Sequence, residues 1–209
     1  MICVSLANTD LLTCLHRAAE YPMVEIRLDL FHFDPEQIAL IGQTSNPWIA
    51  TCRPGKYNER ERTVQLAASI RAGASWIDLE YESSPEFKKD LIELARKERC
   101  KVIISWHDFE KTPEVQKLDQ LITDSRDMGA DLVKIVPTVQ TSGDAAKILG
   151  LYEHHQNLIA FGMGEKGKIT RIAAPLLGAP FTYASASDNK AVAPGQIAYH
   201  DLINIYSKL

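Results

Sequence analysis

The sequence lacks several features that mark large classes of protein. Its 209 residues include only four cysteines, which form no C-x-x-C pair: Cys3, Cys14, Cys52 and Cys100. This spacing suggests neither a zinc site nor a disulfide framework, so we expect four small buried residues. The apolar runs are only a few residues long, whereas a membrane-spanning helix needs about 20. Because the first residues also show no basic segment followed by an apolar one, we expect a cytoplasmic protein with no membrane partner.

An excess of positive charge is missing too. The sequence has 23 Lys and Arg against 27 Asp and Glu, a formal net charge of −4, with both signs interspersed. Nucleic acids bind basic surfaces, so we expect no nucleic-acid partner. Hydrophobic residues make up 45% of the sequence, which is typical of a globular protein and excludes disorder. No linker-like segment is present, which predicts a single domain over residues 1–209.

What the sequence does contain is a repeat of short apolar segments rich in β-branched residues. Eight of them recur about every 26 residues, the length of one strand plus one helix, and eight such units close a (β/α)8 TIM barrel. The predicted strands are Ile2–Leu6, Met23–Asp29, Trp48–Arg53, Trp76–Tyr81, Lys101–Asp108, Leu132–Pro137, Leu158–Met163 and Phe181–Ser185. A doubly wound open sheet is the alternative fold, but no G-x-G-x-x-G follows the first strand.

Helices are predicted between these strands. They cover Asn8–Glu20, Asp34–Ile41, Glu59–Ala72, Pro85–Arg99, Pro113–Met128, Gly143–His154, Lys166–Leu177 and Gly195–Ser207. Three of them begin with proline after a residue that can cap a helix: Asp34-Pro35, Ser84-Pro85 and Thr112-Pro113.

Polar residues recur on one face of the predicted strands. Glu25, Arg27 and Asp29 alternate with apolar residues, and the outer face of a parallel barrel must be apolar because helices cover it. The charged trio is therefore expected to point into the barrel. The same alternation gives inward positions to Arg53, Asp78, Glu80, Ser105, His107 and Lys134. Charges inside a barrel are costly unless they are paired, which favours a functional site or satisfied ion pairs.

Lys134 and His107 are the candidate catalytic pair. Lys134 stands between apolar residues, where burial and nearby cations such as Arg27 or Arg53 would lower the pKa of its amine. A neutral amine is what a Schiff-base lysine needs. His107 ends a predicted buried strand, at the face where barrel active sites form, whereas His16, His32, His154, His155 and His200 fall in predicted helices or loops. Lysine beside histidine suggests chemistry next to a carbonyl group.

Six segments resemble, in order, the motifs of the type I 3-dehydroquinate dehydratase family. They are Glu25-Ile26-Arg27-Leu28-Asp29, Thr51-Cys52-Arg53, Ser105-Trp106-His107-Asp108-Phe109, Val133-Lys134-Ile135-Val136, Phe161-Gly162-Met163-Gly164 and Ala193-Pro194-Gly195-Gln196-Ile197. The resemblance spans nearly the whole chain. It implies a (β/α)8 barrel that converts 3-dehydroquinate to 3-dehydroshikimate in the shikimate pathway of aromatic amino acid biosynthesis. It also implies a homodimer, no metal and no dissociable cofactor.

By this resemblance, Lys134 would form an imine with the substrate C3 ketone. His107 would assist imine formation, remove the C2 proton and then protonate the departing C1 hydroxyl from the same side, a syn elimination. Among the substrate-binding residues, Arg171 resembles the arginine that pairs with the substrate carboxylate. The other implied contacts are Glu25 and Arg27 with the ring hydroxyls, Arg53 in the substrate site, Gln196 on the closing loop, and Ser5.

The sequence departs from the family pattern in two places. Many members have serine four residues before the glutamine, where this chain has Val192. The hydroxyl contact to the substrate is therefore either missing or supplied by Ser185 or Ser187. Many also have Glu-Gly-Gly after the third-strand arginine, and that glutamate orients the histidine. Here the segment reads Pro54-Gly55-Lys56-Tyr57-Asn58-Glu59-Arg60-Glu61, in which Glu59 is the candidate substitute.

Three other functions compete with this interpretation. A class I aldolase or transaldolase would use the same Lys134 imine and bind a phosphate at residues 162–167. A metal-dependent barrel would take its ligands from Glu25, Asp29, Glu80 and His107, although an interior lysine would repel the ion. A noncatalytic barrel that only binds a small acid is the third alternative.

Overall fold

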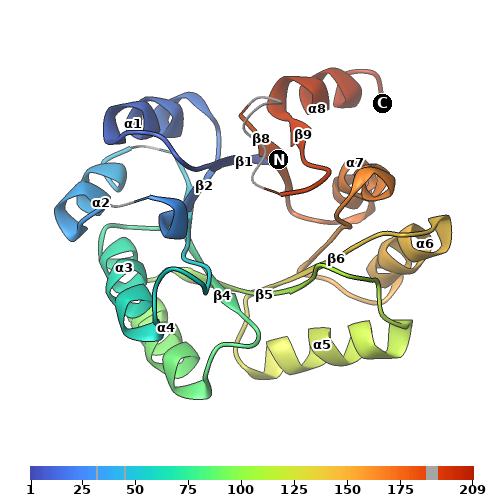
Figure 1. The fold of residues 1–209 in the computed structure, drawn as a ribbon, viewed down its shortest axis with the longest axis horizontal. Coiled ribbons are helices and arrows are strands. Elements are labelled where there is room, and N and C mark those ends of the chain that lie inside the picture. The colour runs from blue at the N-terminus through green and yellow to red at the C-terminus, as the bar shows by residue number, and fades with distance from the viewer. Residues whose placement is uncertain (32, 45, 187–192) are drawn as a thin grey trace. The chain divides into compact units, whose positions relative to one another are not determined.

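The structure is a computed structural model that describes residues 1–31, 33–44, 46–186 and 193–209 (Figure 1). The chain folds into two compact units. Residues 5–104 form the N-terminal unit, and residues 1–4 with 105–209 form the C-terminal unit. Both boundaries fall inside a strand, β1 (Ile2–Leu6) or β5 (Lys101–Asp108). The single domain expected from the sequence stays a prediction.

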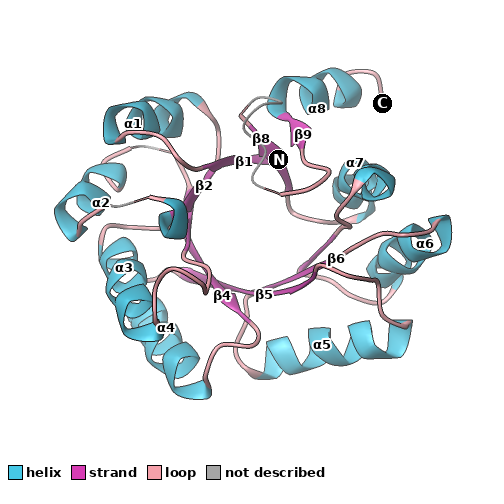
Figure 2. Cartoon of the chain, viewed as in Figure 1, coloured by secondary structure: helices cyan, strands magenta, loops and turns pink. Residues whose placement is uncertain are grey.

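The N-terminal unit is a parallel sheet with helices on one side. Strand β2 (Val24–Arg27) pairs with β3 (Trp48–Thr51) from Val24↔Trp48 to Arg27↔Thr51, and β3 pairs with β4 (Trp76–Glu80). The connecting helices α1–α4 lie together on one side of these strands (Figure 2). They are α1 (Leu11–Glu20), α2 (Pro35–Ile41), α3 (Glu59–Arg71) and α4 (Pro85–Lys97), with a 3-10 turn η1 (Leu28–Leu30) after β2.

The C-terminal unit repeats this arrangement. Strand β6 (Leu132–Pro137) neighbours β5 and pairs in parallel with β7 (Leu158–Ala160), while β8 (Thr182–Ser185) neighbours β1 and pairs with β9 (Ile197–Ala198). Its helices are α5 (Val115–Asp127), α6 (Ser142–Gly150), α7 (Lys168–Ala173) and α8 (Tyr199–Tyr206). The 3-10 turns are η2 (Leu151–Glu153), η3 (Glu165–Gly167) and η4 (Ala174–Leu177).

All eight predicted strands are present, and β1, β5 and β6 have the predicted bounds. The short β9 was not predicted, and the helix expected from Gly195 begins only at Tyr199. Gly195 has φ +73°, in the left-handed region that a right-handed helix does not use. The predicted start of the first helix at Asn8 was wrong for the same reason, because Asn8 has φ +51° and Asp10 caps α1 instead.

Two of the three predicted caps before a proline are present in the structure. Asp34 and Ser84 each accept a backbone N–H of the next turn, with proline at the start of α2 and α4. The prediction for Thr112 was wrong, because α5 begins at Val115. The Thr112 hydroxyl instead donates to the Thr138 carbonyl oxygen at 2.8 Å, so it connects its own loop to the loop after β6.

The core is apolar and contains the cysteines. All four are buried free thiols, as predicted. Burial raises the pKa of Cys14 and of Cys52 to about 12, so neither thiol is a nucleophile at neutral pH. In the part of the chain that the structure describes, every helix is too short or too polar to cross a bilayer.

Candidate active site

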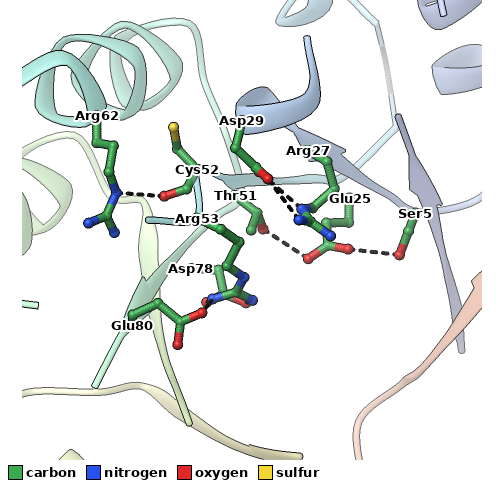
Figure 3. A network of polar contacts seen from close by, with 10 residues as sticks. All are labelled: Ser5, Glu25, Arg27, Asp29, Thr51, Cys52, Arg53, Arg62, Asp78 and Glu80. Carbon is green, nitrogen blue, oxygen red and sulfur yellow. Dashed lines mark hydrogen bonds and ion pairs between the residues drawn. The ribbon is translucent and has the colours of Figure 1, made fainter. Parts of the chain in front are cut away.

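In the N-terminal unit, Glu25 is held at both carboxylate oxygens (Figure 3). The Ser5 hydroxyl donates to Oε2 at 2.7 Å and the Thr51 hydroxyl donates to Oε1 at 2.9 Å. Their strands, β1 and β3, flank β2 in the sheet, so strand pairing places the three side chains together. Glu25 is only 3% exposed, and its orientation is fixed by two donors. The sequence pointed to Glu25 and Ser5 but not to Thr51.

Arg27 forms a two-point ion pair with Asp29. Its Nε donates to Oδ1 at 3.0 Å and its Nη2 donates to Oδ2 at 2.7 Å (Figure 3). Burial by itself lowers the pKa of Arg27, but the hydrogen bonds to Asp29 and the charge of Glu25 outweigh it, so the pKa rises. The guanidinium therefore stays charged and oriented.

Arg53 stands just after β3 and joins two acidic residues of β4. Its Nη1 and Nη2 donate to the two Asp78 oxygens at 2.9 and 2.8 Å, and Nη1 lies 2.6 Å from Glu80 Oε1 (Figure 3). Burial works to lower the pKa of Arg53, yet the charges of Asp78 and Glu80 raise it well above its usual value. The structure thus unites three residues that strand alternation assigned to one face.

Arg62 on α3 belongs to the same network and was not predicted. Its Nε donates to the Cys52 carbonyl oxygen at 2.8 Å (Figure 3). Arg62 was missed because the charged segment Glu59-Arg60-Glu61-Arg62 is typical of the exposed start of a helix. A signal was present, however, because Arg62 shares the spacing of the buried Leu66 and Ile70.

Glu59, the candidate for orienting His107, has a different set of hydrogen bonds. The Ser84 backbone N–H and hydroxyl donate to its two oxygens at 2.9 and 2.7 Å. These bonds lower the pKa of Glu59 and tie the start of α3 to the start of α4. A role in orienting His107 stays a prediction.

In the C-terminal unit, Lys134 is buried on β6, as predicted. Only 4% of it is exposed, and its strand neighbours Val133 and Ile135 are buried as well. The Lys134 Nζ lies 3.9 Å from the centre of the Tyr183 ring, over its face. Tyr183, which stands on β8, was not predicted as a site residue from the sequence.

His107 is at the end of β5, the strand next to β6 in the sheet. Its ring is half-buried and stacks on Phe109 with 6.2 Å between ring centres. Ser105, two residues earlier and so on the same strand face, is fully buried. Lys134 and His107 thus come from neighbouring strands, in agreement with the predicted strand order.

Arg171 on α7 is a buried cation without a carboxylate partner among the described residues. It is 1% exposed, and its guanidinium lies 4.2 Å from the centre of the Phe161 ring. Nη2 donates weakly to the Pro194 carbonyl oxygen at 3.5 Å, and Nε finds no hydrogen-bond acceptor in the described chain. Burial lowers the pKa of Arg171 to about 10. An anionic ligand would satisfy such a group.

The segment before Gln196 packs on the loop after β7. The Gly164 N–H donates to the Pro194 carbonyl oxygen at 3.3 Å, the same oxygen that Arg171 approaches. A Cβ on Gly195 would lie 2.4 Å from the Gly164 carbonyl oxygen, so this close approach needs glycine. These contacts hold the segment that precedes Gln196 against Gly164 and bring its Pro194 carbonyl oxygen within reach of Arg171.

This chain has Val192 where many family members have a serine, and the structure describes only one of the two serines that could replace it. Val192 and Ser187 lie outside the described residues, as does His32. Ser185 is described: it is fully buried on β8, and its hydroxyl has no hydrogen-bond partner in the described chain. Its unmet hydrogen-bonding capacity is compatible with the role of Ser185 as a candidate for that contact.

Metal binding was one of the alternatives. No group of three or more His, Cys, Asp or Glu side chains within the described ranges is arranged to hold a metal ion. Arg27 and Arg53 bind the oxygens of Asp29 and Glu80, two of the ligands that this alternative named.

The family model of type I 3-dehydroquinase matches residues 2–209. The chain belongs to this family. A 3-dehydroquinase relative, the 3-dehydroquinate dehydratase of Dehalococcoides mccartyi (strain CBDB1), is 33% identical over 98% of this chain and 94% of its own length. That of Thermococcus gammatolerans is 37% identical over 89% and 87%. This membership decides against the aldolase alternative.

Solved 3-dehydroquinate dehydratase structures share the fold. The Clostridium difficile enzyme has a TM-score of 0.87 at 24% identity and covers 99% of this chain and 90% of its own. The Aquifex aeolicus enzyme has a TM-score of 0.84 at 26% identity, with 100% and 98% covered. With parallel strands alternating with helices, the predicted fold class is confirmed: a (β/α)8 TIM barrel.

Proposed function

We propose that this chain removes water from 3-dehydroquinate through an imine between Lys134 and the substrate ketone. Family membership supports the activity itself, that of a hydro-lyase of the 3-dehydroquinate dehydratase kind, without specifying its mechanism. The observation that carries the finer proposal is the buried amine of Lys134, which lies on a strand next to that of His107. A lysine that only formed a surface ion pair would not be placed inside a sheet.

The first step is attack of the Lys134 amine on the C3 carbonyl carbon. The nitrogen forms a bond to the carbonyl carbon, one proton is taken up, the carbonyl oxygen leaves as water, and a protonated imine results. The Tyr183 ring supports this step because its face, 3.9 Å from Nζ, stabilises a positive charge on that nitrogen. The positive imine then acts as the electron sink that acidifies the neighbouring C2–H bond.

His107 carries the proton in the second step. It removes the C2 proton, the electron pair moves into the imine to give an enamine, and the enamine expels the C1 hydroxyl. The same proton, now on His107, goes to that hydroxyl, which leaves as water. Hydrolysis of the imine by another water frees Lys134 and 3-dehydroshikimate, so one water is released in total.

Arg171 is assigned to the substrate carboxylate. A buried guanidinium with an unsatisfied Nε offers a two-point site for a planar anion. By family resemblance, the ring hydroxyls are assigned to Glu25 and Arg27, with Arg53 as a further binding residue and Ser5 and Gln196 as additional contacts. Ser5 also fixes the orientation of Glu25.

Reduction with borohydride in the presence of 3-dehydroquinate tests the imine directly. Borohydride converts an imine into a stable amine, so we expect the ligand mass on one peptide that contains Lys134. The measurement is intact mass followed by peptide mapping, and the control omits the substrate. Label on another lysine, or no label on an enzyme that turns over, would refute the assignment.

Arg171→Met is expected to raise the KM for 3-dehydroquinate about 100-fold, because a charge-assisted pair to the carboxylate is lost. Steady-state kinetics measures it. The control is Lys168→Met in the same helix, where the half-exposed amine forms an ion pair with Glu165 and KM should not change. An unchanged KM in a folded Arg171→Met enzyme would contradict the assignment.

The remaining expectations rest on the resemblance and on composition. We infer a place in the shikimate pathway from the substrate and a homodimer from the family. The modest net charge argues against nucleic-acid partners, and the short apolar runs favour a cytoplasmic location. Size-exclusion chromatography with light scattering tests the dimer.

A further inference from the structure

Arg62 is a buried cation in the N-terminal unit that the proposed mechanism does not use. Its side chain is 2% exposed, and none of the described carboxylates forms an ion pair with it. Nε donates to the Cys52 carbonyl oxygen at 2.8 Å, Nη2 donates to the Ser83 hydroxyl at 3.2 Å, and the guanidinium lies 4.5 Å from the centre of the Phe87 ring. Its hydrogen-bond partners are neutral, although the charges of Glu59 and Glu80 also favour the charged form of Arg62. Burying a cation in such a place is costly, so we expect a role that explains it.

The two hydrogen bonds of Arg62 connect the segment that carries Arg53 with the segment that follows Asp78 and Glu80, the ion-pair partners of Arg53. The carbonyl of Cys52 belongs to the peptide bond that leads into Arg53 (Figure 3). Ser83 follows the end of β4, where its backbone N–H donates to the Glu80 carbonyl oxygen at 3.1 Å. Arg62 therefore links the backbone that presents Arg53 to the loop behind its partner Glu80.

An arginine is the side chain that this geometry requires. Its planar fork reaches a carbonyl oxygen and a hydroxyl at once while one face stacks on an aromatic ring. A lysine has the same charge but no fixed fork, so it would satisfy one acceptor and leave the other without a donor. Helix α3 begins three residues earlier with a capping box at Asn58, which fixes the position of Arg62.

We propose that Arg62 is a positioning residue that holds Arg53 in its substrate-binding orientation by tying the Cys52 carbonyl to Ser83. The inference rests on the assignment of Arg53 to substrate binding under the proposed function. Arg53 stands two residues beyond the end of β3 at Thr51, in the segment whose Cys52 carbonyl oxygen Arg62 binds. Arg62 touches neither the reacting atoms nor the substrate and acts through Arg53 alone.

A double-mutant cycle on the full chain tests the inference. In the wild-type background, Arg62→Met and Arg62→Lys are both expected to raise the KM for 3-dehydroquinate about tenfold, with kcat changed by less than about twofold. In an Arg53→Lys background, which keeps a cation beside Asp78 and Glu80, neither change should raise KM further. The matched control is Arg60→Met, an exposed arginine in the same helical turn, which should leave KM unchanged.

Each other outcome overturns the inference. The same fold-change in KM in both backgrounds would mean that Arg62 acts independently of Arg53, through general stability. Wild-type KM in Arg62→Lys would mean that charge alone suffices. If Arg62→Met fails to fold, Arg62→Lys decides. If Arg53→Lys itself leaves KM unchanged, the assignment of Arg53 under the proposed function fails. If Arg53→Lys raises KM but neither Arg62 variant does so in the wild-type background, only the positioning role is refuted.

Discussion

Lys134→Met is expected to abolish dehydration of 3-dehydroquinate, with kcat reduced by about 10⁵-fold or more. Methionine is unbranched, fits the buried position on β6 and packs well against the face of an aromatic ring such as Tyr183. The fold is therefore retained while the amine that forms the imine is gone. Formation of the conjugated enone of 3-dehydroshikimate, followed by ultraviolet absorbance, measures the loss.

A second lysine provides the matched control for this variant. Lys101 also stands on a strand, β5, and its Nζ lies over the Trp76 ring at 5.0 Å from the ring centre, but the side chain is exposed. Lys101→Met should therefore keep wild-type kcat. Turnover by Lys134→Met within tenfold of wild type would mean that the reaction proceeds without an imine at this residue, and the proposed mechanism would be wrong.

The fold was predictable from sequence because its signals are local and periodic. Strand residues alternate between two faces, so β5 and β6 could be placed with the observed bounds, and capping residues such as Asp34 and Ser84 marked where helices begin. The prediction failed where backbone dihedral angles decide. Asn8 and Gly195 both have positive φ, and no hydrophobic period reveals that.

Only part of the candidate site was predictable from the sequence. Alternation identified Glu25, Arg53 and Lys134 because a charge in an apolar strand is conspicuous. Pairings between distant segments could not be read in the same way. Tyr183 beneath Lys134 comes from another strand, about 50 residues along the chain, and looks like an ordinary core aromatic. Arg62 was hidden because its helix begins with charged residues that mostly face solvent.

His107→Ala is expected to lower kcat about 10³-fold or more while still allowing the imine at Lys134 to form. Elimination needs a group that takes the C2 proton and returns it to the C1 hydroxyl, and alanine provides neither. Imine formation needs only the neutral amine and proton exchange with water, so it is slowed less. Mixing the variant with 3-dehydroquinate and reducing with borohydride should therefore trap on Lys134 the reduced imine of 3-dehydroquinate, which still carries the C1 hydroxyl.

The state of the trapped adduct separates His107 from a purely structural residue. If His107 were only packing against Phe109, the variant would form product and the trapped adduct would carry the dehydrated mass. His154→Ala, which removes an exposed histidine of the same unit, serves as the control and should behave as wild type. Failure of a folded His107→Ala enzyme to trap any adduct would assign the histidine to imine formation rather than to elimination, because the covalent step would then be the one that is lost.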